Sequence, residues 1–177
     1  METTVINLYG SPCSGKSTIA SGLFYKMKLA GFNVELASEW IKGKVYEEAP
    51  YPFTDQLYTF ANQNKIIRQM VGKVDYVICD SPLLQTCVYQ TREPKIYNQM
   101  AYEYYSLYRN INVVLKRNHE FRQEGRIHTE AQSVVIDEKI KEFLQELSVD
   151  YTTVSSSNAL DVVYKMIKED FYEQQHK

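Results

Sequence analysis

The sequence contains little cysteine, no long apolar run and almost no net charge. The three cysteines, Cys13, Cys79 and Cys87, are odd in number and lack metal-ligand spacing, which predicts free thiols in a reducing compartment. The first residues lack the basic and apolar segments of a signal peptide, and no apolar stretch approaches the roughly 20 residues of a membrane helix. A net charge of −2 does not favour general nucleic-acid binding. We therefore expect a soluble cytoplasmic protein without membrane association.

What the sequence does contain is an alternation of short apolar runs and amphipathic segments, which is typical of a parallel sheet flanked by helices. With 177 residues, a single domain over residues 1–177 is expected. Strands are predicted over residues 4–9, 34–37, 74–79, 111–115 and 151–154. Helices are predicted over residues 15–30, 54–71, 83–109 (in two pieces), 129–147 (opened by a capping box of Thr129 and Gln132) and from Asn158 onwards. The predicted fold class is α/β with a five-stranded parallel sheet.

The strongest motif lies between the first predicted strand and the first predicted helix and fits the pattern G-x-x-x-x-G-K-[ST]. Its residues are Gly10, Ser11, Pro12, Cys13, Ser14, Gly15, Lys16 and Ser17, followed by Thr18. Glycines let the backbone curl so that its N–H groups converge on phosphate oxygens, and the next helix points its positive end at the same anion. Lys16 is expected to reach the β- and γ-phosphates of ATP, and the Ser17 hydroxyl to bind Mg²⁺. The motif predicts a P-loop nucleotide-binding protein.

Acidic residues follow two of the other predicted strands. Asp80 comes directly after the apolar residues 77–79, where a P-loop enzyme needs a carboxylate to hold or orient Mg²⁺. Glu39 follows the second strand, at the sheet edge where open α/β sheets bind ligands. Its carboxylate could accept a proton from an acceptor hydroxyl, or it could bind a sugar hydroxyl and only position it. Trp40 could pack under the acceptor or in the core.

A basic segment, residues 117–128, separates the fourth predicted strand from the capped helix. Its arginines, Arg117, Arg122 and Arg126, are candidates for a short lid. Arginines that close over a transferring phosphoryl group stabilise its charge and exclude water. The alternative is a solvated charged loop. The histidines of this segment receive no role.

Three further residues are candidates for the wall of an acceptor site. Gln63 lies on an amide-rich predicted helix, and amides can read the edge of a base through paired hydrogen bonds. Thr86 and Tyr89 follow Asp80 closely. Many of the 15 tyrosines lie between residues 89 and 108, where they could form helix surface, a wall that stacks on a base, or the surface of a homodimer.

The order of these motifs resembles the small P-loop kinases related to the ribosylnicotinamide kinase domain of the bifunctional NAD-biosynthesis regulator, and especially the nucleotide-kinase-like proteins often carried by bacteriophages. The resemblance rests on residues 10–18, 38–40, 60–63, 79–84 and 125–126 ahead of the helix that includes residues 131–140. It implies phosphate binding by Lys16 and Ser17, a metal role for Asp80, and substrate roles for Glu39 and Gln63. For a phage-encoded chain, the compartment would be the host cytoplasm.

Two details refine the resemblance. The pair Glu39-Trp40 is also similar to the acid and nearby tryptophan of deoxynucleoside kinases. Ribosylnicotinamide kinases usually carry Asp-Thr-Asp after the third strand, whereas residues 80–82 here are Asp-Ser-Pro. The missing second acid argues against nicotinamide riboside as the acceptor.

The sequence therefore predicts a kinase that uses ATP and Mg²⁺ to phosphorylate a hydroxyl of a small nucleoside or nucleotide-like acceptor. A hydroxymethylated pyrimidine base in DNA is a less favoured acceptor, because an extruded base needs a basic channel and the sequence offers only the lid arginines and scattered lysines. A nucleotide-operated regulatory ATPase is the alternative from another class of protein.

Overall fold

The computed structural model of the chain describes residues 2–48, 54–90, 92–124 and 128–176. Its strands form one parallel sheet in the order β2-β3-β1-β4-β5. The strands are β1 (Thr4–Tyr9), β2 (Val34–Ala37), β3 (Tyr76–Cys79), β4 (Arg109–Lys116) and β5 (Thr152–Ser155). The predicted five-stranded parallel sheet is confirmed, and its central strand β1 is buried along its whole length.

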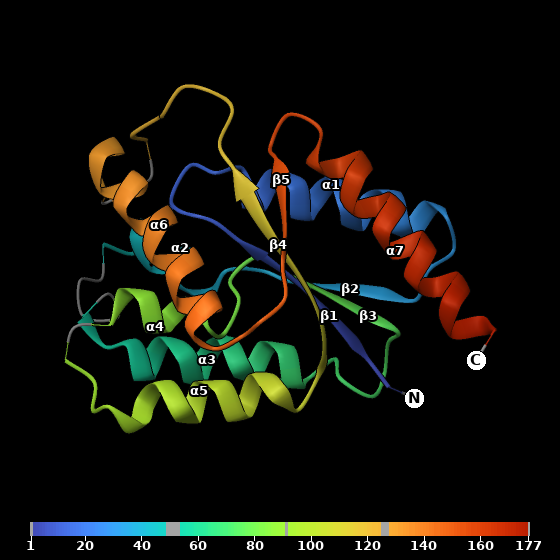
Figure 1. The fold of residues 1–177 in the computed structure, drawn as a ribbon, viewed down its shortest axis with the longest axis horizontal. Helices are drawn as coiled ribbons and strands as arrows, with labels where there is room; N and C mark the ends of the chain where they lie inside the picture. Colours follow the sequence, from blue (N-terminus) through green and yellow to red (C-terminus); the bar gives the residue numbers. More distant parts are fainter. Residues whose placement is uncertain (1, 49–53, 91, 125–127, 177) are drawn as a thin grey trace.

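Helices cover both faces of the sheet (Figure 1). They are α1 (Lys16–Leu29), α2 (Trp40–Tyr46), α3 (Gln56–Arg68), α4 (Gln85–Tyr89), α5 (Ile96–Ser106), α6 (Glu130–Glu146) and α7 (Ala159–Gln175). One face packs against α1 and α7, whose buried side chains join those of alternate residues of β1 such as Ile6 and Leu8. The other face packs against α3, α4, α5 and α6 around Val5 and Tyr9. Alternation of side chains along β1 therefore supplies both halves of the core.

The structure departs from the sequence expectations in a few places. Residues 40–46 form the helix α2, which the sequence reading did not predict. The helix expected over residues 83–109 is divided into α4 and α5, as its proline suggested. The capping box of α6 is confirmed: the Gln132 backbone N–H donates to Thr129 Oγ1 at 3.3 Å, and the Thr129 N–H donates to Gln132 Oε1 at 2.8 Å. Asn158 holds the N-cap position of α7, but its side chain makes no capping hydrogen bond.

An ion pair fastens α7 to the amino-terminal edge of the sheet. The Arg109 guanidinium donates to both carboxylate oxygens of Asp170 and also to Thr4 Oγ1 at 2.9 Å. The Tyr76 hydroxyl donates to the same carboxylate at 3.1 Å. Burial alone would raise the pKa of Asp170, but the bonds from Arg109 and Tyr76 outweigh it and lower that pKa.

No helix within the described ranges combines the length and apolar character that crossing a membrane requires.

Candidate active site

The loop that follows β1 carries the phosphate-binding motif and leads directly into α1. Gly10 has a φ of +154°, and a Cβ there would lie 2.4 Å from Ser14 Oγ. Gly15, just before the helix, has a φ of +95°. Both positions favour a residue without a side chain. The Lys16 ammonium donates to the carbonyls of Gly10 and Ser11 at 2.7 and 3.2 Å, so its charge lies within the curve of the loop.

Side chains from distant parts of the chain hold this loop in place. Gln85 of α4 uses both ends of its amide on Gly10: Nε2 donates to the Gly10 carbonyl at 3.1 Å, and Oε1 accepts from its N–H at 3.3 Å. From α6, Asp137 Oδ1 accepts from the Ser11 N–H at 2.8 Å, and Ser133 Oγ donates to the Pro12 carbonyl at 3.1 Å. The sequence does not predict these three supports, because no local pattern links residues so far apart.

Asp80 follows β3 at the carboxyl-terminal edge of the sheet, beside the loop. Only 5% of the residue is exposed, and its Oδ1 has no hydrogen-bond partner among the described residues. Burial raises the pKa of this carboxyl, although the charge of Lys16, a hydrogen bond with Ser17 and the charge of Lys42 oppose the shift. A buried carboxylate oxygen without a partner is costly unless a ligand approaches it.

The donor set around Asp80 fits a magnesium ion bound together with phosphate. Mg²⁺ prefers oxygen ligands and commonly takes one or two from protein, with the others from phosphates and water. Asp80 and the Ser17 hydroxyl supply such oxygens. Within the described ranges, no three His, Cys, Asp or Glu side chains gather closely enough to hold a metal ion by themselves. The arrangement therefore suits an ion that arrives with a nucleotide.

Glu39 follows β2 and occupies the N-cap position of α2. The turn that carries it is braced by Gln63 of α3, whose Oε1 accepts from the Trp40 N–H at 2.9 Å and whose Nε2 donates to the Ser38 carbonyl at 3.2 Å. Gln63 is 1% exposed and is absent from the described lining of the cavity that lies between the P-loop and Glu39. The Gln63 amide thus bonds to the backbone on either side of Glu39 and does not face the cavity. The Trp40 ring packs against Tyr58 of α3 and likewise does not line the cavity.

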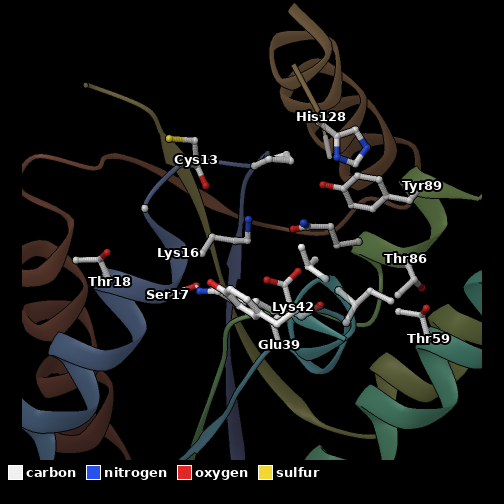
Figure 2. Close-up of a pocket in the computed structure, with 18 of the residues that line it drawn as sticks. Cys13, Lys16, Ser17, Thr18, Glu39, Lys42, Thr59, Thr86, Tyr89 and His128 are labelled. Carbon is white, nitrogen blue, oxygen red and sulfur yellow. The ribbon is translucent and has the colours of Figure 1, made fainter. Parts of the chain in front are cut away.

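A cavity of about 390 Å³ joins the loop to Glu39. Figure 2 shows Lys16, Ser17 and Thr18 on one side of it and Thr59, Thr86 and Tyr89 on the other. Described residues that line it are Pro12, Cys13, Ser14, Gly15, Lys16, Ser17, Thr18, Glu39, Ile41, Lys42, Val45, Tyr46, Gln56, Thr59, Ser81, Gln85, Thr86, Tyr89, Glu124 and His128. The structure therefore brings the predicted Glu39, Thr86 and Tyr89 together with the P-loop. The missed helix α2 contributes four residues, from Ile41 to Tyr46.

Tyr89 and His128 form an aromatic pair at the cavity (Figure 2), with ring centroids 5.6 Å apart. Burial and the negative charge of Glu39 raise the pKa of the Tyr89 phenol. Burial lowers the pKa of His128, so its imidazole is neutral near pH 7. The sequence alone predicts no role for His128. A lone histidine carries no local signal for such a position.

The lid arginines do not converge on this cavity within the described residues. Arg117 donates to Glu130 at 3.0 Å, and its guanidinium lies 5.2 Å from the centre of the Phe121 ring. Arg122 lines a second cavity of about 510 Å³ that also includes P-loop residues, with Thr18, Ile19, His119 and Ser156 among its other lining residues. Arg126 lies outside the described residues.

Comparison with known families agrees with the geometry of the loop. Residues 5–160 match the family model described as an AAA domain. The chain belongs to the AAA domain family. No curated protein matches the sequence.

Solved structures similar to this AAA domain include three that match over nearly the whole chain. Deoxyadenosine kinase from M. mycoides, with dCMP and dCDP bound, has 15% identity and a TM-score of 0.57, covering 96% of this chain and 99% of that one. Thymidylate kinase from Ehrlichia chaffeensis has 14% identity and a TM-score of 0.61, covering 94% and 100%. YorR from Bacillus subtilis, in complex with phosphorylated GDP, has 16% identity and a TM-score of 0.62, covering 99% of each. At such identities the likeness establishes the fold, which is that of a P-loop nucleotide kinase.

Proposed function

We propose that this AAA domain protein is a kinase that transfers the γ-phosphoryl group of ATP, with Mg²⁺, to a hydroxyl of a nucleoside or nucleotide-like acceptor. The observation that carries the proposal is the pair of cavities that meet at residues 13–18. Both contain Cys13, Gly15 and Thr18, and their other lining residues differ. In-line phosphoryl transfer places donor and acceptor on opposite sides of the transferred group, and two cavities that share the P-loop support a separate site for each.

The donor nucleotide would bind with its phosphates on the loop and its nucleoside in the cavity lined by Arg122 and Ser156. Lys16 would leave its carbonyl partners, Gly10 and Ser11, for the β- and γ-phosphates. Ser17 and Asp80 would hold the magnesium ion, Asp80 directly or through a water molecule. The ion would neutralise charge on the phosphates during transfer. The orphaned oxygen of Asp80 supports this assignment.

The acceptor would enter the cavity beside Glu39. In one role, Glu39 accepts the proton of the attacking hydroxyl; in the other, it fixes the hydroxyl by a hydrogen bond. Gln63 would act as a positioning residue, since it holds the backbone on either side of Glu39. A covering role for Arg122 and Arg126 over the phosphates stays a prediction. For Arg117 the ion pair with Glu130 favours a structural role instead.

Transfer of label from γ-labelled ATP to a panel of acceptors tests the proposal. The panel contains nucleosides, their monophosphates, nicotinamide riboside, and plain and hydroxymethyl-pyrimidine DNA, with Lys16→Ala as the inactive control. Label on one acceptor class that depends on Lys16 would establish the kinase.

Two other outcomes point elsewhere. Label on hydroxymethylated DNA alone would favour the macromolecular acceptor. Label released only as free phosphate, at a rate that no acceptor changes, would refute the kinase assignment and favour a regulatory ATPase. In the latter case Glu39→Gln should leave ATP turnover unchanged, whereas in a kinase it should cut transfer more than it weakens ATP binding.

A further inference from the structure

The helix α2 turns one face toward the cavity between the P-loop and Glu39. The residues of this segment that line the cavity are Glu39, Ile41, Lys42, Val45 and Tyr46. Glu39, Lys42 and Tyr46 are three and four positions apart, which is the spacing of residues on one face of a helix. Lys42 therefore lies on the same side of α2 as Glu39, and Figure 2 shows both among the residues that line the cavity.

The charge of Lys42 acts on the two residues that would hold the magnesium ion. Its ammonium donates to Ser17 Oγ at 3.5 Å. Burial raises the pKa of Asp80, and the charge of Lys42 is one of the influences, after that of Lys16, that oppose the shift. Lys42 is thus a second lysine beside the place where the donor phosphates and their metal would bind.

The contact between Lys42 and Ser17 restricts where the ammonium can lie in the complex with Mg²⁺ and ATP. An ammonium and a magnesium ion repel each other at such short distances unless an anion lies between them. The γ-phosphoryl group of ATP is that anion, and its oxygens can bind the two cations separately. The flexible stem of a lysine lets its ammonium move while the helix stays in place. The ammonium of Lys42 then belongs on a γ-oxygen that the metal does not contact.

We propose that Lys42 is a further catalytic residue, whose ammonium binds an oxygen of the γ-phosphoryl group and stabilises the charge of that group during transfer. This inference rests on the proposed kinase function. Lys16 would act on the β- and γ-phosphates from the P-loop, whereas Lys42 approaches the transferred group from α2, the helix that begins after Glu39. The charge on the γ-oxygens in the transition state is then shared by cations from two sides.

The transfer itself leaves Lys42 chemically unchanged. The oxygen of the acceptor hydroxyl bonds to the γ-phosphorus while the bond from that phosphorus to the β,γ-bridging oxygen breaks, and ADP leaves with the bonding electron pair. The hydroxyl proton passes to Glu39 if that residue is the base, or to water if Glu39 only positions the hydroxyl. Lys42 keeps its protons throughout and contributes only charge and hydrogen bonds.

The first test measures nucleotide binding, which needs neither an acceptor nor turnover. Calorimetry with Mg²⁺ compares a non-hydrolysable ATP analogue with ADP, which lacks the γ-phosphate. In Lys42→Met, which keeps an apolar stem and removes the charge, we expect the preference for the analogue over ADP to fall by about tenfold. Lys44→Met is the matched control, because Lys44 lies on the same helix, is paired with Glu47 and is absent from the described lining of the cavity.

Two results of the binding test would contradict the contact with the γ-phosphate. One is a preference for the analogue over ADP that stays unchanged in Lys42→Met. The other is an equal fall of that preference in Lys42→Met and Lys44→Met, which would show a nonspecific effect of charge on α2. Because Lys42 is exposed and α2 has no buried residue, both variants should keep the unfolding midpoint of the unaltered protein.

The second test measures the transfer of label to the acceptor that the panel identifies. We expect kcat to fall by about a hundredfold in Lys42→Met, with little change in the KM for acceptor, because the lost charge acts on the transition state. Lys42→Arg should recover at least about tenfold of the loss, since arginine restores the charge, whereas a purely structural role would not depend on charge. Lys44→Met should transfer label normally.

The outcomes separate a failure of this inference from a failure of the kinase assignment. Normal transfer in Lys42→Met would overturn the inference and leave the kinase intact. Label on no acceptor would overturn the kinase, and the catalytic role of Lys42 with it. If Lys42→Met instead lost affinity for a monophosphate acceptor and kept its preference for the analogue over ADP, Lys42 would belong to the acceptor site and the inference would be wrong.

Discussion

The two edges of the sheet differ in how far their polar groups are paired. At the amino-terminal edge, the carboxylate of Asp170 accepts hydrogen bonds from Arg109, Tyr76 and Gln174. At the carboxyl-terminal edge, several buried polar atoms have no partner among the described residues. They are the hydroxyl of Tyr9, Oγ of Ser14, Oδ1 of Asp80 and Nη1 of Arg117.

The contrast separates polar groups that are paired within the fold from buried polar atoms that no described residue satisfies. Satisfied buried polar networks stabilise and specify a fold, while unsatisfied ones cost free energy. The carboxyl-terminal edge carries that cost at the P-loop and beside Asp80, where phosphates and a cation would supply the missing partners. Variants at the carboxyl-terminal edge should therefore lose activity, whereas variants at the amino-terminal edge should lose stability.

The largest effect is expected for Lys16→Ala at the P-loop. Loss of the ammonium should lower phosphoryl transfer by at least about a hundredfold, because its charge would stabilise the β,γ-phosphates. Steady-state turnover with ATP and Mg²⁺ measures this. Lys28→Ala on the same helix, paired with Glu35 at the surface, is the control and should be normal. Full activity of Lys16→Ala would rule out the P-loop assignment.

A smaller effect is expected for Asp80→Asn. The variant should need about tenfold more Mg²⁺ for half-maximal turnover, because an amide is a weaker ligand for the ion or its water than a carboxylate. A Mg²⁺ titration at saturating ATP checks this. Asp75→Asn, at the opposite end of the same strand, should titrate as the unaltered protein does. Identical titrations for Asp80→Asn and the unaltered protein would remove Asp80 from the metal site.

Gln63→Leu tests whether this buried amide positions Glu39 or reads the acceptor. Because its hydrogen bonds go to Ser38 and Trp40, we expect kcat to fall by about tenfold with little change in the KM for acceptor. A raised acceptor KM at constant kcat would instead restore the direct contact with substrate that the sequence suggested. Asn62→Leu, one position earlier on α3 and half-buried, controls for the change in helix composition.

The smallest functional effect is expected at the opposite edge. Asp170→Asn should leave turnover unchanged and lower the free energy of unfolding by about 1–2 kcal/mol at pH 7, because Arg109 loses its charged partner. The folded-state pKa of Asp170 is lowered, so its contribution is fully present above about pH 4 and is lost as the pH falls through the folded-state value. Denaturant unfolding at pH 7 and at pH 3 should therefore show a smaller difference at pH 3.

Asp161→Asn is the control for that experiment, since Asp161 lies on the same helix as Asp170 and forms an exposed ion pair with Lys26 of α1. Exposed pairs contribute little, so its stability should match the unaltered protein closely. A difference for Asp170→Asn that stays constant between the two pH values would contradict the titration argument.

Sequence patterns were sufficient for the architecture because they reflect local physics. Runs such as residues 4–9, buried on both faces, alternate with amphipathic helices, and the capping box marks the start of α6 to the residue. The helix α2 escaped detection because it has no buried residue and contains Gly43. A short helix that lines a cavity with half-exposed side chains lacks the apolar stripe on which such predictions depend.

The site was predictable where the chemistry lies within one motif and less so where it depends on the tertiary fold. The spacing of residues 10–18 predicts the phosphate-binding loop. The positions of Asp80 and Glu39 after predicted strands indicate that both lie at the site. The supports from Gln85, Ser133 and Asp137 exist only after folding. The same is true of Gln63. The sequence suggests that its amide contacts the acceptor, whereas in the structure the amide bonds to the backbone of Ser38 and Trp40.

The distance along the chain between the P-loop and its supports has a consequence for protein synthesis. Gly10 and Ser11 bond to side chains 75 and 126 positions later. A nascent chain whose β1 and α1 have left the ribosome therefore carries the complete motif without the side chains that shape it, and without the strands that flank β1. We expect nucleotide to stabilise a chain synthesised through α6 more than a shorter one, because a ligand favours the state that binds it and the shorter chain lacks Ser133 and Asp137. We therefore expect ATP to favour the finished fold over its truncated precursors.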